Sequence, residues 1–202
     1  MKKGIIKKTV MLGLGLVLAA GLVGCSGQNE DKKASDTNSK KEIVMGLDNT
    51  FVPMGFLNDK NELEGFDIDL AKEAFKRAGY TVKFQNIDWS MKEQALDNGN
   101  VDCLWNGYSI TEERKARVAF SKPYFDNKQI AITMSTESPT KLADLKDQVV
   151  GTQAASSALE AIEANKEFIG MIKDQKPVTY DTYDKALRDL EIGRIKAVVG
   201  DE

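Results

Sequence analysis

The sequence contains no histidine and only two cysteines among its 202 residues. Without histidine, the chain cannot build Ser-His or Cys-His nucleophile systems, histidine-rich zinc or iron sites, or an imidazole pH switch. We therefore predict no metal site and no cofactor, and any catalysis would depend on carboxylates, lysines, tyrosines or hydroxyls. The net charge of −3 is weakly acidic. Because the basic residues are scattered among acidic ones, a nucleic-acid partner is not expected.

A long apolar run occurs at the N-terminus. Four lysines lie between residues 2 and 8, and an uncharged stretch runs from Val10 to Gly24. This layout is typical of an export signal, and the run is shorter than the roughly 20 residues that a membrane span needs. Residues 22–25, Leu-Val-Gly-Cys, resemble a bacterial lipobox, in which the cysteine is lipidated. We predict a signal peptide at residues 1–24 and a lipid on Cys25; the alternative is an uncleaved anchor helix with an incidental cysteine.

The segment after Cys25 is polar. Residues 26–40 contain no large apolar side chain, so residues 25–41 are expected to form a flexible tether behind the lipid. Lipidation of Cys25 leaves Cys103 without a partner for an intramolecular disulfide. Cys103 lies in an apolar run, where a buried strand cysteine is expected.

From residue 42 onward, short β-rich runs alternate with helical patterns, which favours an α/β fold with largely parallel sheets. We predict two lobes, residues 42–131 and 132–202. The predicted strands span residues 43–47, 81–87, 101–105, 129–134, 149–152, 178–180 and 195–199, with residues 119–124 also extended. The predicted helices span residues 67–78, 90–99, 111–117, 141–146, 156–168 and 182–192, with Ser90 and Glu93 as a capping box and Gly79 as a C-terminal cap.

Two stretches carry groups suited to binding an anion. Residues 105–114 run from a strand end through a loop into a helix, where loop amides, the Ser109 hydroxyl and the Arg114 guanidinium could converge on a carboxylate. The alternative for Arg114 is an exposed helix residue paired with a neighbouring glutamate. Residues 151–158 form a strand, a small-residue turn and a helix start that offers free N–H groups. Its serine could also merely cap its own helix.

The order of the motifs resembles a known family. Five stretches, residues 65–71, 109–114, 120–124, 151–158 and 192–201, resemble the polar amino acid solute-binding proteins (family 3) of bacterial ABC importers. The resemblance implies a two-lobed periplasmic-binding-protein-like fold of type II, with each lobe a mostly parallel sheet flanked by helices. It also implies a monomeric, non-enzymatic receptor on the outer face of the cytoplasmic membrane, which delivers an amino acid to a permease and its ATPase.

The resemblance also implies roles for individual residues. Arg114 matches the arginine that binds the ligand α-carboxylate, assisted by Ser109 and the amide of Ser157, and Asp201 matches the aspartate that pairs with the α-ammonium. A zwitterion taken out of water needs both charges matched, which fits these groups. The predicted ligand-binding set is Asp48, Phe51, Trp89, Asn106, Gly107, Ser109, Arg114, Gln153, Ser156, Ser157 and Asp201.

Other positions bear on specificity. Phe51 and Trp89 match aromatics that contact the ligand, although core packing is the alternative. Asp48 matches an acid that reaches the side chain of the ligand. Ala155 stands where many relatives have glycine, and Asn106 and Gly107 stand where others have hydroxyl residues. An acid with aromatic faces favours a cationic side chain, so arginine or lysine is the expected ligand, followed by glutamine or cystine.

Two other functions fit the same fold. One is an exported prephenate or arogenate dehydratase with a carboxylate as general acid, and the other is a sensor lobe of a receptor kinase. Asp201 is better used on an ammonium, and a lipobox argues against a receptor kinase. The chain ends at residue 202, directly after a predicted strand. Because family members continue past this aspartate, we expect the sequence to be a fragment that lacks part of both lobes.

Overall fold

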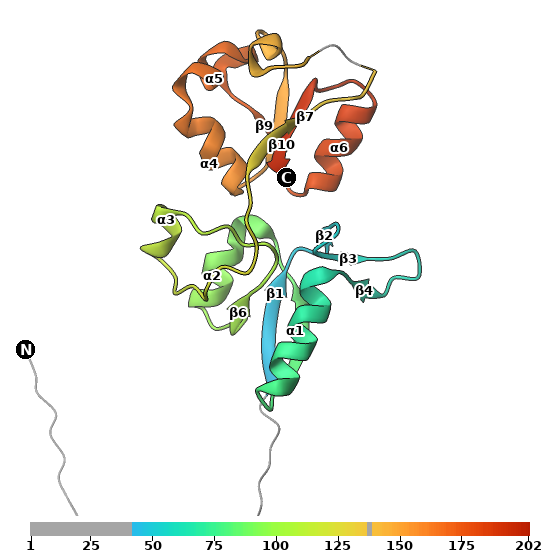
Figure 1. The fold of residues 1–202 in the computed structure, drawn as a ribbon, viewed down its shortest axis with the longest axis vertical. Helices are drawn as coiled ribbons and strands as arrows, with labels where there is room; N and C mark the ends of the chain where they lie inside the picture. The colour runs from blue at the N-terminus through green and yellow to red at the C-terminus, as the bar shows by residue number, and fades with distance from the viewer. Residues whose placement is uncertain (1–41, 137–138) are drawn as a thin grey trace, which may run out of the picture. The chain divides into compact units, whose positions relative to one another are not determined.

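The computed structural model describes residues 42–136 and 139–202 (Figure 1). The predicted signal peptide, the lipidation of Cys25 and the whole predicted tether lie outside the described residues. In the described ranges, we find no helix with the length and apolar character that crossing a membrane requires.

The first lobe is built around a parallel sheet with strand order β5-β1-β6. Its strands are β1 (Glu42–Leu47), β5 (Thr81–Asn86) and β6 (Cys103–Leu104). Helix α1 (Phe66–Arg77) packs on this sheet, and its buried Ile68 and Ala71 join Met45 and Leu47 in one hydrophobic core. The α/β pattern predicted for this part of the chain is therefore confirmed, with the third strand shorter than predicted.

Small elements surround the first sheet. A separate antiparallel sheet contains β2 (Thr50–Phe51), β3 (Gly55–Leu57) and β4 (Leu63–Glu64). The sequence did not predict these strands, because two or three residues are too few to show an alternating pattern. The short helices of this lobe are η1 (Trp89–Met91), α2 (Lys92–Asp97) and α3 (Glu112–Lys115).

The start of η1 differs from the prediction. Asp88, not Ser90, caps this turn: its Oδ1 accepts hydrogen bonds from the Ser90 amide at 2.9 Å and the Ser90 hydroxyl at 2.7 Å. The predicted capping box of Ser90 and Glu93 is therefore wrong. The cap moves by two residues because the aspartate carboxylate accepts both donors of the serine.

The second lobe contains a four-stranded sheet with strand order β7-β10-β8-β9. Its strands are β7 (Gln129–Ile132), β8 (Val150–Gln153), β9 (Val178–Tyr180) and β10 (Ala197–Asp201). Strand β7 runs antiparallel to β10, and the other pairs are parallel. The boundary predicted between residues 131 and 132 lies inside β7, whose first residue is Gln129.

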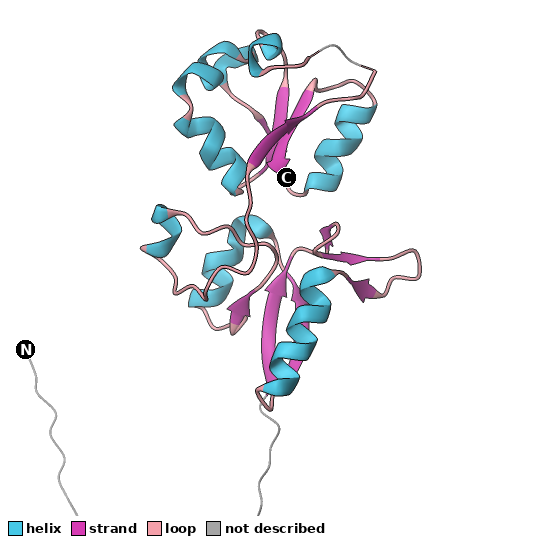
Figure 2. Ribbon diagram, in the orientation of Figure 1, coloured by secondary structure: helices cyan, strands magenta, loops and turns pink. Residues whose placement is uncertain are grey.

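Helices lie on both faces of the second sheet (Figure 2). Its helices are η2 (Leu142–Leu145), α4 (Ser157–Ala164), α5 (Lys166–Met171), η3 (Lys173–Gln175) and α6 (Tyr183–Glu191). Ala197 and Val199 of β10 pack in the cluster that includes α4 and α5, whereas Val198 packs in the cluster that includes α6. A strand covered on both faces has no polar side, which explains its continuous apolar sequence.

The helix predicted at residues 156–168 is two helices. Asn165 interrupts it and caps α5, with its Oδ1 accepting from the Phe168 amide at 3.0 Å. Ile162 and Phe168 bury in the same core, so the apolar pattern continues across the break and hides it. Residues 119–124, predicted as extended, form no strand.

Candidate functional site

A cavity lies where strand ends and helix starts of both lobes meet. It is lined by Phe51, Trp89, Asn106, Gly107, Ser109, Arg114, Gln153, Ser156, Ser157, Tyr183 and Asp201. The structure thus brings together every predicted ligand-binding residue except Asp48, which lies behind Gln153. Tyr183 was not predicted. The cavity holds about 10 Å³, which is about the room of one water molecule. A ligand larger than water can therefore enter only if side chains or lobes move.

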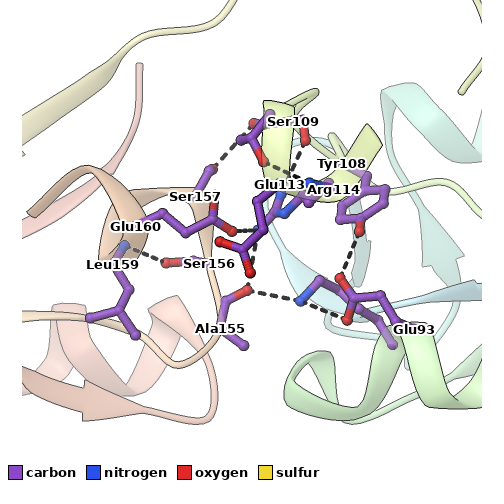
Figure 3. Close-up of polar contacts among 12 residues, drawn as sticks. Glu93, Tyr108, Ser109, Glu113, Arg114, Ala155, Ser156, Ser157, Leu159 and Glu160 are labelled. Atoms are coloured by element: carbon purple, nitrogen blue, oxygen red, sulfur yellow. Dashed lines mark hydrogen bonds and ion pairs between the residues drawn. The ribbon is translucent and has the colours of Figure 1, made fainter. Parts of the chain in front are cut away.

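Arg114 is the central charged group of the site. Its side chain is buried, with 3% of the residue exposed, and its guanidinium stacks over the Tyr108 ring at 4.7 Å. Nη1 donates to the Ser109 carbonyl at 3.1 Å, and Nη2 donates to the Ala155 carbonyl at 3.2 Å (Figure 3). Nη2 also lies 2.9 Å from a carboxylate oxygen of Glu160. A buried cation with partners from both lobes is suited to holding an anion between them.

Helix α3 presents Arg114 to the cavity. Its N-terminus begins after Thr111, whose hydroxyl accepts from the Arg114 amide at 3.2 Å, as the sequence predicts. Glu112 pairs with Lys115, and Glu113 pairs with Arg117. The alternative in which Arg114 is exposed and paired with Glu112 or Glu113 is therefore wrong.

Hydroxyl and amide groups connect Ser109 to Asp201. The Ser109 hydroxyl accepts from the Ser157 hydroxyl at 3.2 Å and from Asn127 Nδ2 at 3.0 Å. Asn127 Nδ2 also donates to Asp201 Oδ1, to which Gln129 Nε2 donates at 2.7 Å. Asp201 ends β10 and is half-buried. A cationic side (Arg114) and an anionic side (Asp201) therefore face one cavity.

Helix α4 contributes its first turn. Ser156 caps this helix, with its hydroxyl accepting from the Leu159 amide at 3.1 Å and donating to the Gln153 carbonyl at 2.8 Å. The Ser156 hydroxyl thus caps its own helix, which is the alternative considered for this stretch of sequence. The Ser157 hydroxyl, by contrast, reaches Ser109 of the first lobe (Figure 3). The free amides of such a helix start favour a carboxylate.

A second buried cation of the first lobe, Lys92, donates to the same backbone carbonyl as Arg114, that of Ala155. Lys92 is 2% exposed, and its Nζ donates to the Ala155 carbonyl at 2.8 Å. The same Nζ lies 3.4 Å from the Glu93 carboxylate and 5.3 Å from the centre of the Trp89 ring. Burial lowers the pKa of Lys92, and the Glu93 charge opposes this shift. Lys92 and Arg114 thus hold one backbone oxygen of the second lobe.

Asp67 positions the loop that carries Gly107. This carboxylate is fully buried at the start of α1 and accepts from the Gly107 amide at 2.7 Å, Tyr124 Oη at 2.8 Å and Trp105 Nε1 at 3.2 Å. Burial raises the pKa of Asp67, and these three hydrogen bonds oppose the rise. In the sequence, Asp67 belongs to the motif at residues 65–71, and nothing local predicts this role, because it depends on long-range contacts.

Asp48, Gln153 and Asn106 form a buried polar group. Gln153 Nε2 donates to Asp48 Oδ2 at 2.8 Å and to the Asp181 carbonyl at 2.9 Å. The Asp48 amide donates to Asn106 Oδ1 at 3.0 Å. Asn106 Nδ2 is buried and has no hydrogen-bond partner among the described residues. An unpaired buried donor is costly, and a ligand acceptor would satisfy it.

Aromatic rings form the rest of the wall. Phe51 stacks on Tyr183 with ring centres 5.7 Å apart, and Trp89 meets Tyr108 edge-on at 5.7 Å. The Tyr183 hydroxyl is buried and has no hydrogen-bond partner in the described part of the chain. Burial, with the nearby Asp201 charge, raises the pKa of Tyr183 to about 12, so this hydroxyl stays protonated at neutral pH.

The described residues also include potential metal ligands and one cysteine. Across residues 42–136 and 139–202, no group of three or more cysteine and acidic residues is arranged to hold a metal ion. Cys103 is half-buried and free, and burial raises the pKa of its thiol to about 11. Such a thiol is inert at neutral pH. The cavity is lined by groups of opposite charge, Arg114 and Asp201.

The chain belongs to the bacterial extracellular solute-binding proteins, family 3, whose family profile matches residues 43–197. It is 31% identical over 164 residues to the ABC transporter arginine-binding protein 1 of Escherichia coli K12, covering 81% of this chain and 65% of that protein. The fold likewise resembles that of an ABC uptake transporter substrate-binding protein from Streptococcus pneumoniae with bound histidine, at 41% identity and a TM-score of 0.79.

A further solved structure is similar. An ancestral arginine-binding protein bound to arginine is 36% identical with a TM-score of 0.72, covering 79% of this chain and 70% of that one. The match to the Streptococcus pneumoniae structure covers 82% of this chain and 68% of that one. The chain thus spans about two thirds of the length of these proteins. All three are named for binding or transport, and none is named as an enzyme.

Proposed function

We propose that the chain is the amino-acid-binding receptor of an ABC import system, which clamps a free amino acid between its lobes and delivers it to a permease and its ATPase. The receptor acts as a monomer on the outer side of the cytoplasmic membrane, held there by a lipid on Cys25. The family of the chain supports this role. So does the name of its Escherichia coli relative, an ABC transporter arginine-binding protein.

One observation carries the proposal: the cavity is lined by both Arg114 and Asp201. The buried guanidinium, the Ser109 and Ser157 hydroxyls and the first turn of α4 suit an α-carboxylate, and Asp201 suits an α-ammonium. Each charge of a zwitterion loses water on entering, so each needs an opposite charge inside. The site supplies one of each.

The nature of the wall supports a ligand with a basic side chain. Phe51, Tyr183 and Trp89 offer aromatic faces to the cavity. The negative charge of Asp48 lies behind the cavity-lining Gln153, which donates a hydrogen bond to it. A cation gains from aromatic faces and from a nearby carboxylate. Arginine and lysine are therefore the first candidate ligands, followed by glutamine and cystine.

The direct test is isothermal titration calorimetry of the full-length protein, without its signal peptide, against a panel of amino acids. The panel contains arginine, lysine, histidine, glutamine, cystine and glutamate. We expect saturable one-to-one binding of at least one member, with arginine or lysine tightest. Absence of heat with every member contradicts the receptor role. If purified protein then converts prephenate, the dehydratase alternative replaces it.

The lipid anchor has its own test. Cells that express the protein are labelled with radioactive palmitate, and the label is followed on the wild type and on Cys25→Ser. We expect label and membrane association for the wild type and loss of both for the variant, with Cys103→Ser as the control that keeps both. A labelled Cys25→Ser protein would contradict the predicted lipidation site.

A further inference from the structure

The side-chain amide of Gln153 is held in one orientation. Its Nε2 lies 2.8 Å from Asp48 Oδ2 and 2.9 Å from the Asp181 carbonyl. An ionised carboxylate and a carbonyl only accept hydrogen bonds, so the NH₂ group must be the end that faces them. Both of its hydrogens are used there. What Gln153 has left for the cavity that it lines is Oε1, an acceptor.

Asp48, in turn, is fixed from its own lobe. Oδ1 accepts from the Thr50 amide at 2.9 Å and the Thr50 hydroxyl at 2.7 Å, while the Asp48 amide donates to Asn106. The residue is 5% exposed and does not line the cavity. Two hydrogen bonds saturate Oδ1, whereas Oδ2 accepts one, from Gln153. Because Asp48 lies outside the cavity lining and Gln153 is part of it, Asp48 acts on the cavity through Gln153.

We infer that Gln153 is the residue that recognises the ligand side chain, through Oε1 as a hydrogen-bond acceptor, and that Asp48 is a positioning residue that acts through Gln153. This inference rests on the proposed function, because it assumes that Arg114 and Asp201 hold the α-groups. The ligand class that it selects is an amino acid whose side chain carries N–H donors: a guanidinium, an ammonium, an imidazole or a carboxamide.

The fixed amide also excludes a class of ligand. A side-chain carboxylate has only acceptor oxygens, so beside Oε1 it meets another acceptor, with the negative Asp48 directly behind. Free rotation of the Gln153 amide would remove this discrimination, because the NH₂ group could then turn toward the ligand. The orientation imposed by Asp48 is thus what makes a neutral residue selective.

The first part of the test compares ligands on the full-length wild-type protein. Calorimetric affinities are measured for glutamine, arginine, glutamate and norvaline, whose propyl side chain has no polar group. We expect glutamate to bind at least about tenfold more weakly than glutamine, the effect of one or more unmatched hydrogen-bonding groups. Equal affinity for glutamate and glutamine overturns the inference. Binding of no amino acid overturns the receptor proposal itself, and the inference falls with it.

The second part is a double-mutant cycle with Asp48→Ala, Gln153→Met and the double variant, measured with the tighter of glutamine and arginine. We expect each single variant to weaken binding about tenfold, and the double variant to be no weaker than Gln153→Met alone. Norvaline affinity should stay unchanged in all three. Asp97→Ala and Gln94→Met, which change exposed residues of the same types, should bind like the wild type.

Each other outcome contradicts the inference in a distinct way. If the Asp48→Ala and Gln153→Met losses add up, Asp48 contacts the ligand directly and does not act through Gln153. If norvaline binding falls in parallel with binding of the polar ligand, Asp48 only stabilises the cleft. If Gln153→Met binds the polar ligand as tightly as the wild type does, Gln153 does not recognise the side chain.

Discussion

The two lobes meet the cavity with different chemistry. The fully buried charged residues of the described chain, Asp48, Asp67, Lys92 and Arg114, all belong to the first lobe. The buried polar residues of the second lobe, Thr152, Gln153 and Ser156, are neutral. The charged residue that the second lobe brings to the cavity, Asp201, is only half-buried. The lobes are alike in layout and unlike in the groups that they bury.

This difference means that most of the desolvation cost of burying charges at the contact between the lobes falls on the first lobe. Each buried charge of the first lobe has partners inside that lobe, such as Glu93 for Lys92 and Thr50 for Asp48. The second lobe contributes neutral groups, namely the Ala155 carbonyl, the Gln153 amide and the Ser157 hydroxyl, and one carboxylate, that of Glu160 beside Arg114. In the proposed receptor, separation of the lobes would therefore break one ion pair of a buried charge, Arg114 with Glu160, and leave Lys92 and Asp48 with partners in their own lobe.

The largest loss of ligand affinity is expected for Arg114→Lys, a change in the first lobe. Lysine keeps the charge but loses the planar fork that serves two carbonyls and a carboxylate at once. We expect affinity for the preferred amino acid to fall by at least about 100-fold, the cost of two charge-assisted hydrogen bonds. Titration calorimetry measures this loss. Arg117→Lys, an exposed position paired with Glu113, is the matched control, and an equal loss there would contradict the role.

On the second lobe, Asp201→Asn removes the single carboxylate that lines the cavity. The asparagine keeps the shape and an acceptor oxygen but not the charge, so the α-ammonium loses its counter-ion. We expect affinity to fall about 10-fold to 100-fold, measured by the same titration. Asp184→Asn, whose carboxylate pairs with Arg188 on the exposed side of α6, should change nothing. Unchanged affinity in Asp201→Asn would assign the ammonium to another group.

The buried charge of the first lobe can also be tested through stability. Asp67→Asn removes one of the two acceptor oxygens that serve Gly107, Tyr124 and Trp105. We expect the free energy of unfolding to fall by about 1–3 kcal/mol, measured by urea unfolding. Asp69→Asn, an exposed position in the same turn of α1, should fall by much less.

The pH dependence of the Asp67 effect has a definite sign. Because burial raises the pKa of the folded-state carboxyl above its ordinary value of 3.8, its contribution is largest below that value. The contribution then decreases as the pH rises through the folded-state pKa. The difference in unfolding free energy between wild type and Asp67→Asn should therefore be smaller near pH 7 than near pH 4. A larger difference at the higher pH would contradict the raised pKa.

The smallest effect is expected at the turn of the second lobe. Ala155 has φ of 53°, in the left-handed region, where its Cβ is strained. Ala155→Gly should therefore stabilise the protein by about 0.5–1 kcal/mol, measured as a rise in melting temperature. Ala154→Gly, next to it at an ordinary φ, should destabilise by a similar amount. Two shifts of the same sign would contradict the strain.

Local signals predicted much of the fold. The Thr111 cap, the Gly79 stop and the alternation of apolar runs predicted α1, α3 and the strands of the two main sheets, because each depends on neighbours in the sequence. Features that depend on one side chain were missed. Asn165 breaks a helix by capping the next one, although the apolar pattern continues across it. Asp88 takes the cap expected from Ser90.

The candidate site divides in the same way. Arg114, Ser109, Ser157 and Asp201 could be predicted because each lies in a motif at a strand end or helix start. Tyr183 could not, because it looks like an ordinary position of the amphipathic α6, and only its stacking on Phe51 of the other lobe reveals it. Likewise, nothing local to Asp48 indicates that Gln153 lies between its carboxylate and the cavity.

In the proposed receptor, the cavity recognises a zwitterion through Arg114 on one side and Asp201 on the other. The most direct measurement compares the tightest amino acid of the panel with its α-carboxamide and its Nα-acetyl derivative on the full-length wild-type protein. Both derivatives keep the side chain, and each removes one α-charge. We predict that each binds at least about 100-fold more weakly than the free amino acid. Retention of near-normal affinity by either derivative would contradict the claim.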